Sequence, residues 1–205
     1  AALFGCAVLT GVGAVINTAT LNAGQTVLVV GLGGVGLAAL LGALAGGAAK
    51  VIAADINADK RTAALAMGAH HVVDPAMPEA VQEVKDITGG GVDIAVEFAG
   101  AVKALEFAYA STRRGGITVS AGLPHPSVSF ALSPALLVGE ERTLKGSYLG
   151  SCIPARDIPA FIALHRSGRL PVEQLLSHTI RLHEINEGFE RLAKGLALRQ
   201  IVSFA

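Results

Sequence analysis

The chain has 205 residues and carries 16 basic and 16 acidic side chains. This balance, together with the lack of any Lys/Arg cluster, excludes the positive field that nucleic acid or an anionic membrane requires, so we expect neither as a partner. The length suits one large domain, or one domain with part of another. The two cysteines, Cys6 and Cys152, form no CxxC pair and indicate a reducing compartment such as the cytoplasm.

The first predicted element is an apolar helix over residues 3–20, in which Gly5, Gly11 and Gly13 allow close packing. Neither a Met nor a basic segment opens the chain, so we expect no signal peptide and interpret the sequence as an internal piece of a longer protein. Residues 27–49 form an uncharged apolar run that is long enough to cross a membrane. Seven glycines interrupt this run, which favours a buried strand, a glycine turn and a buried helix.

From residue 25 to residue 149, short β-rich runs alternate with helical stretches. We expect strands at residues 27–30, 50–55, 71–73, 92–97, 116–121 and 143–149, and helices at residues 34–44, 58–67, 78–88, 102–111 and 133–140. Near-continuous apolar strands such as Ile94-Ala95-Val96 need helices on both faces of the sheet. The pattern therefore predicts an α/β fold with a doubly wound, six-stranded parallel sheet of the Rossmann type.

The alternation ends near Leu149. Beyond it we expect helices at residues 154–167 and 183–195, with short extended runs at residues 178–182 and 198–204. We therefore divide the chain into a nucleotide-binding domain with its leading helix, residues 1–149, and a C-terminal segment, residues 150–205.

A glycine-rich turn lies between the first strand and the following helix, with the sequence Gly31-Leu32-Gly33-Gly34-Val35-Gly36. A GxGxxG pattern alone is weak evidence, but this one leaves a buried strand and opens a helix. Gly31 permits the sharp turn, Gly33 lets the backbone approach a pyrophosphate, and Gly36 lets the helix pack against the sheet. The free N–H groups of the helix face the phosphates. The turn therefore predicts a dinucleotide site, in preference to a turn used only for packing.

An acidic residue follows the next strand. Asp55 lies 19 residues after Gly36, where a carboxylate accepts hydrogen bonds from both hydroxyls of the adenosine ribose. Because a 2′-phosphate would meet this negative charge, Asp55 predicts NAD rather than NADP. Ile56 lies next to it at the same edge. Lys60, near the start of the next helix, can reach the same ribose or extend into solvent.

Two further strand ends are expected to contact the cofactor, since ligands of such folds bind at the carboxyl edge of the sheet. These ends are Phe98-Ala99-Gly100 and Ala121-Gly122-Leu123. Their small residues leave room for a ring system.

Several stretches besides the glycine turn carry a family resemblance: Gly5-Cys6-Ala7-Val8-Leu9-Thr10-Gly11, Asp55-Ile56-Asn57-Ala58-Asp59-Lys60, Leu144-Lys145-Gly146, Ile185-Asn186-Glu187-Gly188-Phe189 and Arg199-Gln200-Ile201-Val202. Together they resemble the C-terminal part of the zinc-containing medium-chain alcohol dehydrogenases, over nearly the whole chain. The resemblance implies an oxidoreductase that transfers a hydride between an alcohol or aldehyde and NAD, with zinc as a second cofactor.

The resemblance also implies roles for single residues. Cys6 matches a ligand of the catalytic zinc, and Thr10 matches the threonine that touches the nicotinamide ring at the catalytic centre. Val35 matches the residue behind that ring, and Arg199 matches the arginine that binds the pyrophosphate. The family pairs subunits along the edge strand at residues 144–149, which implies a homodimer or homotetramer.

This chain departs from the family in one respect. Family members carry an N-terminal catalytic domain with the other zinc ligands and the substrate pocket, and the resemblance places residues 150–205 with that domain. One thiolate does not hold a catalytic zinc, which needs three protein ligands. The histidines are expected at surface or packing positions: His70, His71, His125, His165, His178 and His183. We therefore expect the isolated chain to bind NAD without turning over an alcohol.

Three other classes of protein share part of this pattern. A non-catalytic NAD-binding module would share the turn and Asp55, but it would not account for Cys6 and Thr10. A short-chain dehydrogenase needs a Tyr-xxx-Lys pair, whereas Tyr109 is followed by Arg113 and Tyr148 by Cys152 four positions on. A zinc-free quinone reductase of the same superfamily stays open, although such proteins favour NADPH, which the carboxylate disfavours.

Overall fold

The computed structural model describes residues 2–204. Its centre is a six-stranded sheet with the strand order β3-β2-β1-β4-β5-β6, in which each neighbouring pair is parallel. The strands are β1 Thr26–Val30, β2 Lys50–Ala54, β3 His71–Val73, β4 Val92–Glu97, β5 Thr112–Ser120 and β6 Thr143–Gly146. The doubly wound parallel sheet predicted from the alternating pattern is confirmed.

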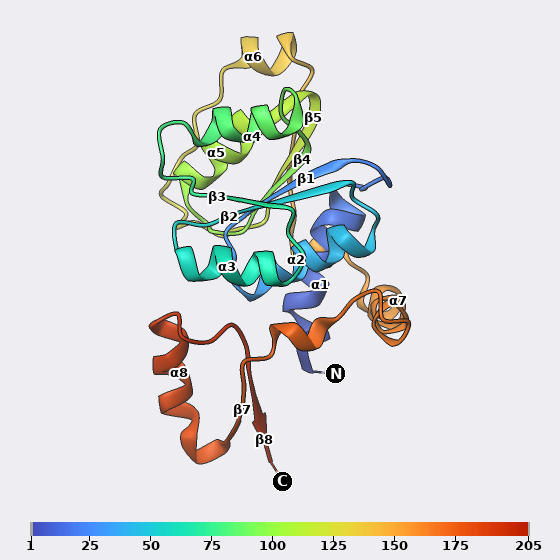
Figure 1. The fold of residues 1–205 in the computed structure, drawn as a ribbon, viewed down its shortest axis with the longest axis vertical. Coiled ribbons are helices and arrows are strands. Elements are labelled where there is room, and N and C mark those ends of the chain that lie inside the picture. Colours follow the sequence, from blue (N-terminus) through green and yellow to red (C-terminus); the bar gives the residue numbers. More distant parts are fainter. Residues whose placement is uncertain (1, 205) are drawn as a thin grey trace.

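Helices cover both faces of the sheet (Figure 1). They are α1 Ala7–Gly13, α2 Gly34–Ala45 and α3 Ala58–Ala66 on one face, and α4 Ala80–Thr88 and α5 Val102–Ser111 on the other. Successive residues of β1 pack on opposite faces, Val27 and Val29 toward the first set and Leu28 and Val30 toward the second. None of the four is more than 1% exposed. Burial on both faces explains why these strands read as continuous apolar runs.

The leading helix is broken, and the prediction of one helix over residues 3–20 is wrong. A 3-10 turn, Ala2–Gly5, precedes α1, and a π-helical turn, Ala14–Thr18, follows it. Cys6 joins the first turn to α1 with φ −140° and ψ −71°, outside the helical region, which ends one element and starts the next.

The glycines of α1 allow the close packing that was predicted for them. A Cβ atom at Gly11 would clash with the carbonyl oxygen of Val35 at the start of α2. On the facing helix, a Cβ at Gly42 would lie 3.0 Å from the Cα of Val12. Backbone therefore meets backbone along this helix pair, which fixes α1 against the glycine turn.

The far edge of the sheet also differs from the prediction. β6 ends at Gly146 rather than near Leu149, because residues 149–151 form a 3-10 turn whose backbone is left-handed, with φ values of 48°, 67° and 51°. β5 begins at Thr112 rather than at residue 116, and its pairing with β4 shifts register between Val92 and Ile94. A short helix, α6 Pro134–Gly139, lies between β5 and β6.

The remainder of the chain falls into two parts. α7 Pro154–Arg166 and a 3-10 turn, Val172–Leu175, pack into the same core as α1 and α2 through Phe161 and Leu175. β7 His178–Arg181 and β8 Gln200–Ser203 form a separate two-stranded parallel sheet, and α8 Ile185–Ala193 connects them (Figure 1). No helix within residues 2–204 is both long and apolar enough to span a membrane.

Candidate functional site

The glycine turn has the geometry that its spacing predicts. Gly31 leaves β1 with φ +89°, and its N–H donates to the Ala54 carbonyl at 2.8 Å. A Cβ at Gly36 would clash with the Gly31 carbonyl oxygen, so the fold itself requires glycine there. Gly33 differs, because nothing lies within 4 Å of the place where its Cβ would stand. Its small size therefore leaves space on the outer side of the turn, where a ligand would approach.

Asp55 lies just past β2 and is 8% exposed. Its Oδ2 accepts a hydrogen bond from the Leu32 N–H at 2.8 Å, and its Oδ1 accepts one from the Asn57 N–H at 2.9 Å. Lys60 brings its Nζ within 3.8 Å of the same carboxylate. The carboxylate thus joins the end of β2 to the glycine turn and faces the crevice between them.

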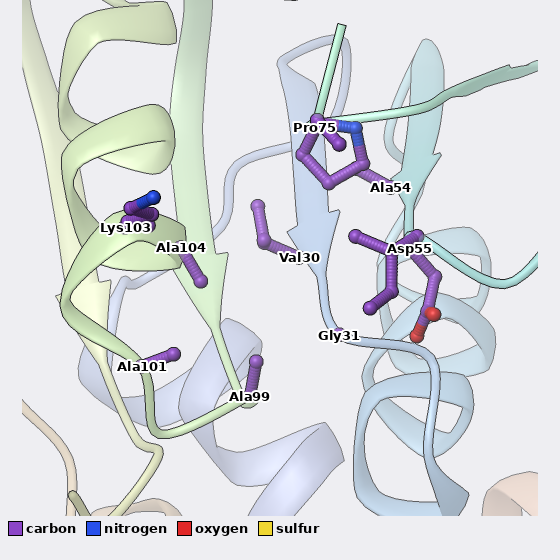
Figure 2. A pocket seen from close by; sticks show the side chains of 11 residues that line it. Val30, Gly31, Ala54, Asp55, Pro75, Ala99, Ala101, Lys103 and Ala104 are labelled. Carbon is purple, nitrogen blue, oxygen red and sulfur yellow. The ribbon is translucent and has the colours of Figure 1, made fainter.

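A cavity of about 230 Å³ opens between the ends of β1, β2 and β4. Figure 2 shows its apolar walls, with Asp55 near Gly31 and Lys103 on α5 across the cavity. The residues that line it are Val30, Gly31, Ala54, Asp55, Ile56, Pro75, Ala76, Ala99, Ala101, Lys103 and Ala104. Small apolar walls beside one carboxylate suit a flat ring joined to a sugar with free hydroxyls.

Part of this cavity was missed from the sequence. Pro75 and Ala76 follow the short strand β3, whose carboxyl end lies at the same edge of the sheet as the ends of β1, β2 and β4. The expectation that ligands bind at the carboxyl ends of the strands, extended to β3, predicts both residues. Lys103 lies inside α5, and no local pattern separates it from an ordinary surface lysine.

Arg199 lies against the first turn of α2, although 165 positions separate it from Gly34. A Cβ at Gly34 would stand 3.1 Å from the Arg199 Cγ and would clash with its Nε. That Nε is buried and has no hydrogen-bond partner among residues 2–204. A cation beside a helix N-terminus faces the positive end of the helix dipole, which is unfavourable unless an anion lies between them. The arrangement therefore fits a phosphate group.

Cys6 and Arg199 line a second cavity, of about 220 Å³. Thr10 lies one helical turn beyond Cys6, and its N–H donates to the Cys6 carbonyl at 2.8 Å. The contact of α1 with Val35 brings this helix to the N-terminus of α2. The structure therefore gathers the residues that the family resemblance singled out around one end of α2.

The two other predicted strand ends lie at the same sheet edge but differ in exposure. The Phe98 N–H donates to the Val30 carbonyl at 2.8 Å, which places Phe98 beside the glycine turn. Gly100 and Gly122 touch backbone to backbone, so that a Cβ at Gly122 would clash with the Gly100 nitrogen. Ala121 packs against the core, whereas Leu123 is 83% exposed.

The residues present fit NAD but do not by themselves fit zinc. The open space at Gly33, the unpaired Arg199 Nε and the Asp55 carboxylate suit the parts of a dinucleotide. Within residues 2–204 no group of three His, Cys, Asp or Glu side chains is placed to hold a metal ion. The histidines include two packing residues: the Nδ1 of His70 accepts from the Val51 N–H, and the ring of His165 packs edge-on against Phe4.

The strand order and the glycine turn define a doubly wound α/β protein of the Rossmann type. A family model described as "Zinc-binding dehydrogenase" matches residues 34–167. Alcohol dehydrogenase 1 of Cenchrus americanus is 38% identical over 200 residues, which cover 96% of this chain and 52% of that protein. Alcohol dehydrogenase 2 of Solanum lycopersicum is 37% identical over 203 residues, 98% of this chain and 53% of that protein.

Solved structures show the same likeness. Benzyl alcohol dehydrogenase from Acinetobacter calcoaceticus aligns with a TM-score of 0.94 at 31% identity, over 98% of this chain and 56% of that one. Alcohol dehydrogenase TADH from Thermus sp. ATN1 aligns with a TM-score of 0.90 at 27% identity, over 99% and 57%. The chain belongs to the zinc-containing medium-chain alcohol dehydrogenase family, as the C-terminal portion of such a protein. It spans about half the length of the curated relatives it matches.

Proposed function

We propose that this chain is the NAD-binding portion of a zinc-dependent alcohol dehydrogenase, which transfers a hydride between an alcohol or aldehyde and NAD. The observation that carries the proposal is the buried, unpaired Nε of Arg199 at the N-terminus of α2, beside the glycine turn. The positive end of the α2 dipole and the Arg199 guanidinium lie side by side there, an arrangement that a bound anion stabilises. The two curated relatives described above are named alcohol dehydrogenases, which supports the substrate class.

Each part of the chain has a distinct task in this proposal. Asp55 accepts hydrogen bonds from the ribose hydroxyls, and the first turn of α2 and Arg199 bind the pyrophosphate. Thr10 and Val35 position the nicotinamide ring, whose C4 supplies or accepts the hydride when the cofactor is bound. The negative charge of Asp55 repels a 2′-phosphate, which sets the preference for NAD over NADP.

Cys6 supplies one thiolate to the catalytic zinc in this proposal. A catalytic zinc site needs three protein ligands, and we assign the others to the half of the relatives that this chain does not span. We therefore infer that the isolated chain binds NAD and oxidises no alcohol. NADH formation from ethanol or benzyl alcohol, followed by absorbance with and without added zinc, tests this inference, and any zinc-dependent turnover would contradict it.

Calorimetric titration of the chain with NAD and NADP tests the cofactor assignment. We expect Asp55→Asn to weaken NAD binding about tenfold or more and to narrow its margin over NADP, because a charge-assisted bond is lost. The exposed Asp59 lies at the same sheet edge, so Asp59→Asn is the matched control and should leave both affinities within about twofold. Equal affinities for the wild-type chain and Asp55→Asn would overturn the assignment.

A second pair of variants tests the pyrophosphate contact. Arg199→Ala should weaken NAD binding by about tenfold to a hundredfold, since hydrogen bonds to charged groups contribute about 1.5–3 kcal/mol. Arg191 lies on α8 and pairs with Glu187 on the same helix. Arg191→Ala should therefore bind NAD like the wild-type chain, and an equal loss in both variants would contradict the assigned role.

We further propose that β6 pairs with its counterpart in a homodimer or homotetramer. β6 is the last strand of the sheet and pairs only with β5 among the described residues, so its other edge offers unpaired backbone groups. Light scattering of the wild-type chain and of a Leu144→Pro variant would test the pairing. The two free thiols, Cys6 and Cys152, support a reducing compartment, for which we propose the cytoplasm.

A further inference from the structure

Glu97 is a buried carboxylate at the carboxyl end of β4, and no part of the proposed function uses it. It is 1% exposed, although charged side chains are rarely buried without compensation. Its Oε1 accepts a hydrogen bond from the Gly100 N–H at 2.6 Å. The compensation therefore comes from the backbone of the turn that follows the strand.

Further backbone amides act on the same side chain. Burial raises the pKa of the Glu97 carboxyl above its usual range, and the N–H groups of Gly100, Ala99, Ala101 and Gly122 counter part of that rise. Burial and these backbone amides are the largest influences on this pKa. The carboxylate thus accepts a hydrogen bond from the turn over residues 98–101 and lies against the backbone of the turn over residues 121–123.

The main chain of Glu97 binds the second turn as well. Its carbonyl oxygen accepts from the Ala121 N–H at 2.9 Å and from the Gly122 N–H at 3.0 Å. A Cβ at Gly122 would stand 2.9 Å from the Glu97 Oε1. One residue therefore fixes the distance between the two turns, through its backbone and its side chain together.

The first of these turns also touches the glycine turn. A Cβ at Gly31 would lie 2.8 Å from the nitrogen of Ala99, so the two backbones are in contact. Ala99 and Ala101 form one wall of the cavity beside Asp55 (Figure 2). A shift of the turn over residues 98–101 would therefore change the width of that cavity.

We propose that Glu97 is a positioning residue that clamps the turns at residues 98–101 and 121–123 together and thereby sets the shape of the adenosine pocket. This inference rests on the proposed function, because the pocket has a task only if the chain binds a nucleotide. A neutral side chain of the same shape accepts fewer of the converging N–H groups, since an amide offers one oxygen in place of two. Glu97 ties the first turn through its carboxylate and the second through its main-chain carbonyl, and its Oε1 lies against the backbone of both.

Glu97→Gln tests the clamp, with Asp93→Asn as the matched control. Asp93 lies on the same strand at the opposite edge of the sheet, where its Oδ2 accepts from the Thr26 N–H and its Oδ1 pairs with Arg113. Both variants convert a carboxylate that is bound by backbone amides into an amide. Only Glu97 lies at the carboxyl edge of the sheet, where the nucleotide is proposed to bind.

Calorimetric titration with NAD and with AMP separates a positioning role from a purely structural one. We expect Glu97→Gln to weaken both ligands about tenfold, while Asp93→Asn lowers the melting temperature and keeps both dissociation constants within about twofold. AMP is informative because it would occupy only the adenosine pocket beside Asp55 and not the nicotinamide part of the site. An AMP or NAD affinity of folded Glu97→Gln within about twofold of wild type would overturn the proposal.

Amide hydrogen exchange on the ligand-free chain gives a readout that does not depend on NAD. Exchange at Gly100, whose N–H donates to the Glu97 carboxylate, should be faster in Glu97→Gln than in the wild-type chain and unchanged in Asp93→Asn. If the wild-type chain binds no NAD, the proposed function fails while this measurement still tests the clamp. Unchanged exchange at Gly100 would overturn the clamp whatever the chain binds.

Discussion

The two sheets of this protein have the same pairing geometry but differ in what covers them. The six-stranded sheet lies between two helical layers, and Leu28 in its first strand is fully buried. The two-stranded sheet of β7 and β8 is also parallel, yet Ile180 is the only buried residue in its two strands. Strand pairing alone therefore does not create a core, because a core needs apolar layers on both sides of the pairing.

The helix beside the small sheet shows the same contrast. α8 places Phe189 at 62% exposure and Leu192 at 40%, while its one buried residue is Gly188. Phe189 and Leu192 lie three positions apart on the helix and therefore share one exposed face. The small sheet and α8 therefore leave apolar surface exposed, and the chain spans about half the length of the curated relatives it matches.

A matched pair of phenylalanines tests this difference most strongly. Phe107 on α5 is 6% exposed and packs in the core beneath the large sheet. Phe107→Ala should lower the free energy of unfolding by about 3–5 kcal/mol, whereas Phe189→Ala should change it by no more than about 0.5 kcal/mol. Urea unfolding followed by circular dichroism measures both. A large loss in Phe189→Ala would show that the small sheet has a core of its own.

A pair of glycines gives the next largest effect. A Cβ at Gly36 would clash with a backbone carbonyl, which cannot move, so Gly36→Ala should cost about 1–3 kcal/mol. A Cβ at Gly188 would stand 2.7 Å from the Cδ1 of Ile180, the mobile end of a side chain. Gly188→Ala should be close to neutral, because the helix gains about 0.5–1 kcal/mol from alanine. Calorimetric melting of both variants tests the contrast, and equal losses would refute it.

Arg169, which follows α7, contacts the end of α2 and so tests how firmly this part of the chain is attached to the large sheet. Its Nη2 donates to the Ala45 carbonyl at 2.8 Å, at the end of that helix. Arg169→Ala should cost about 1 kcal/mol, the contribution of a typical hydrogen bond. Arg191 on α8 pairs with Glu187 at the surface, and Arg191→Ala should cost less than about 0.5 kcal/mol. Chemical unfolding that ranked the two in the reverse order would contradict this picture.

The smallest expected change in the free energy of unfolding depends on pH and comes from Cys152, which lies between the large sheet and α7. Burial, followed by the nearby Asp157 charge, raises the pKa of the Cys152 thiol from 9.0 to about 11. The unfolded chain therefore loses this proton first as the pH rises, so the free energy of unfolding falls between about pH 9 and about pH 11.

Melting temperatures at about pH 8 and about pH 10.5 test this, with Cys152→Ala as the reference that lacks the thiol. The wild-type chain should lose more stability over this interval than the variant does. An equal loss in the two proteins would assign the pH dependence to other groups.

Local sequence determined the large sheet and the nucleotide edge. The alternation of apolar runs with helical stretches specified the six parallel strands, and the spacing from Gly36 to Asp55 placed the carboxylate beside the turn. Such features are readable because each depends on neighbours along the chain: periodicity sets which face is buried, and glycine permits backbone that other residues clash with.

Only the tertiary structure decided the contacts between distant segments. It laid Arg199 against Gly34 and added Lys103 to the cavity wall. It also bound one turn to the carboxylate of Glu97 and a second turn to its main-chain carbonyl. It also broke the leading helix at Cys6. These outcomes depend on which surfaces meet once the sheet has formed, and burial and backbone hydrogen bonds across long sequence separations then outweigh local preference.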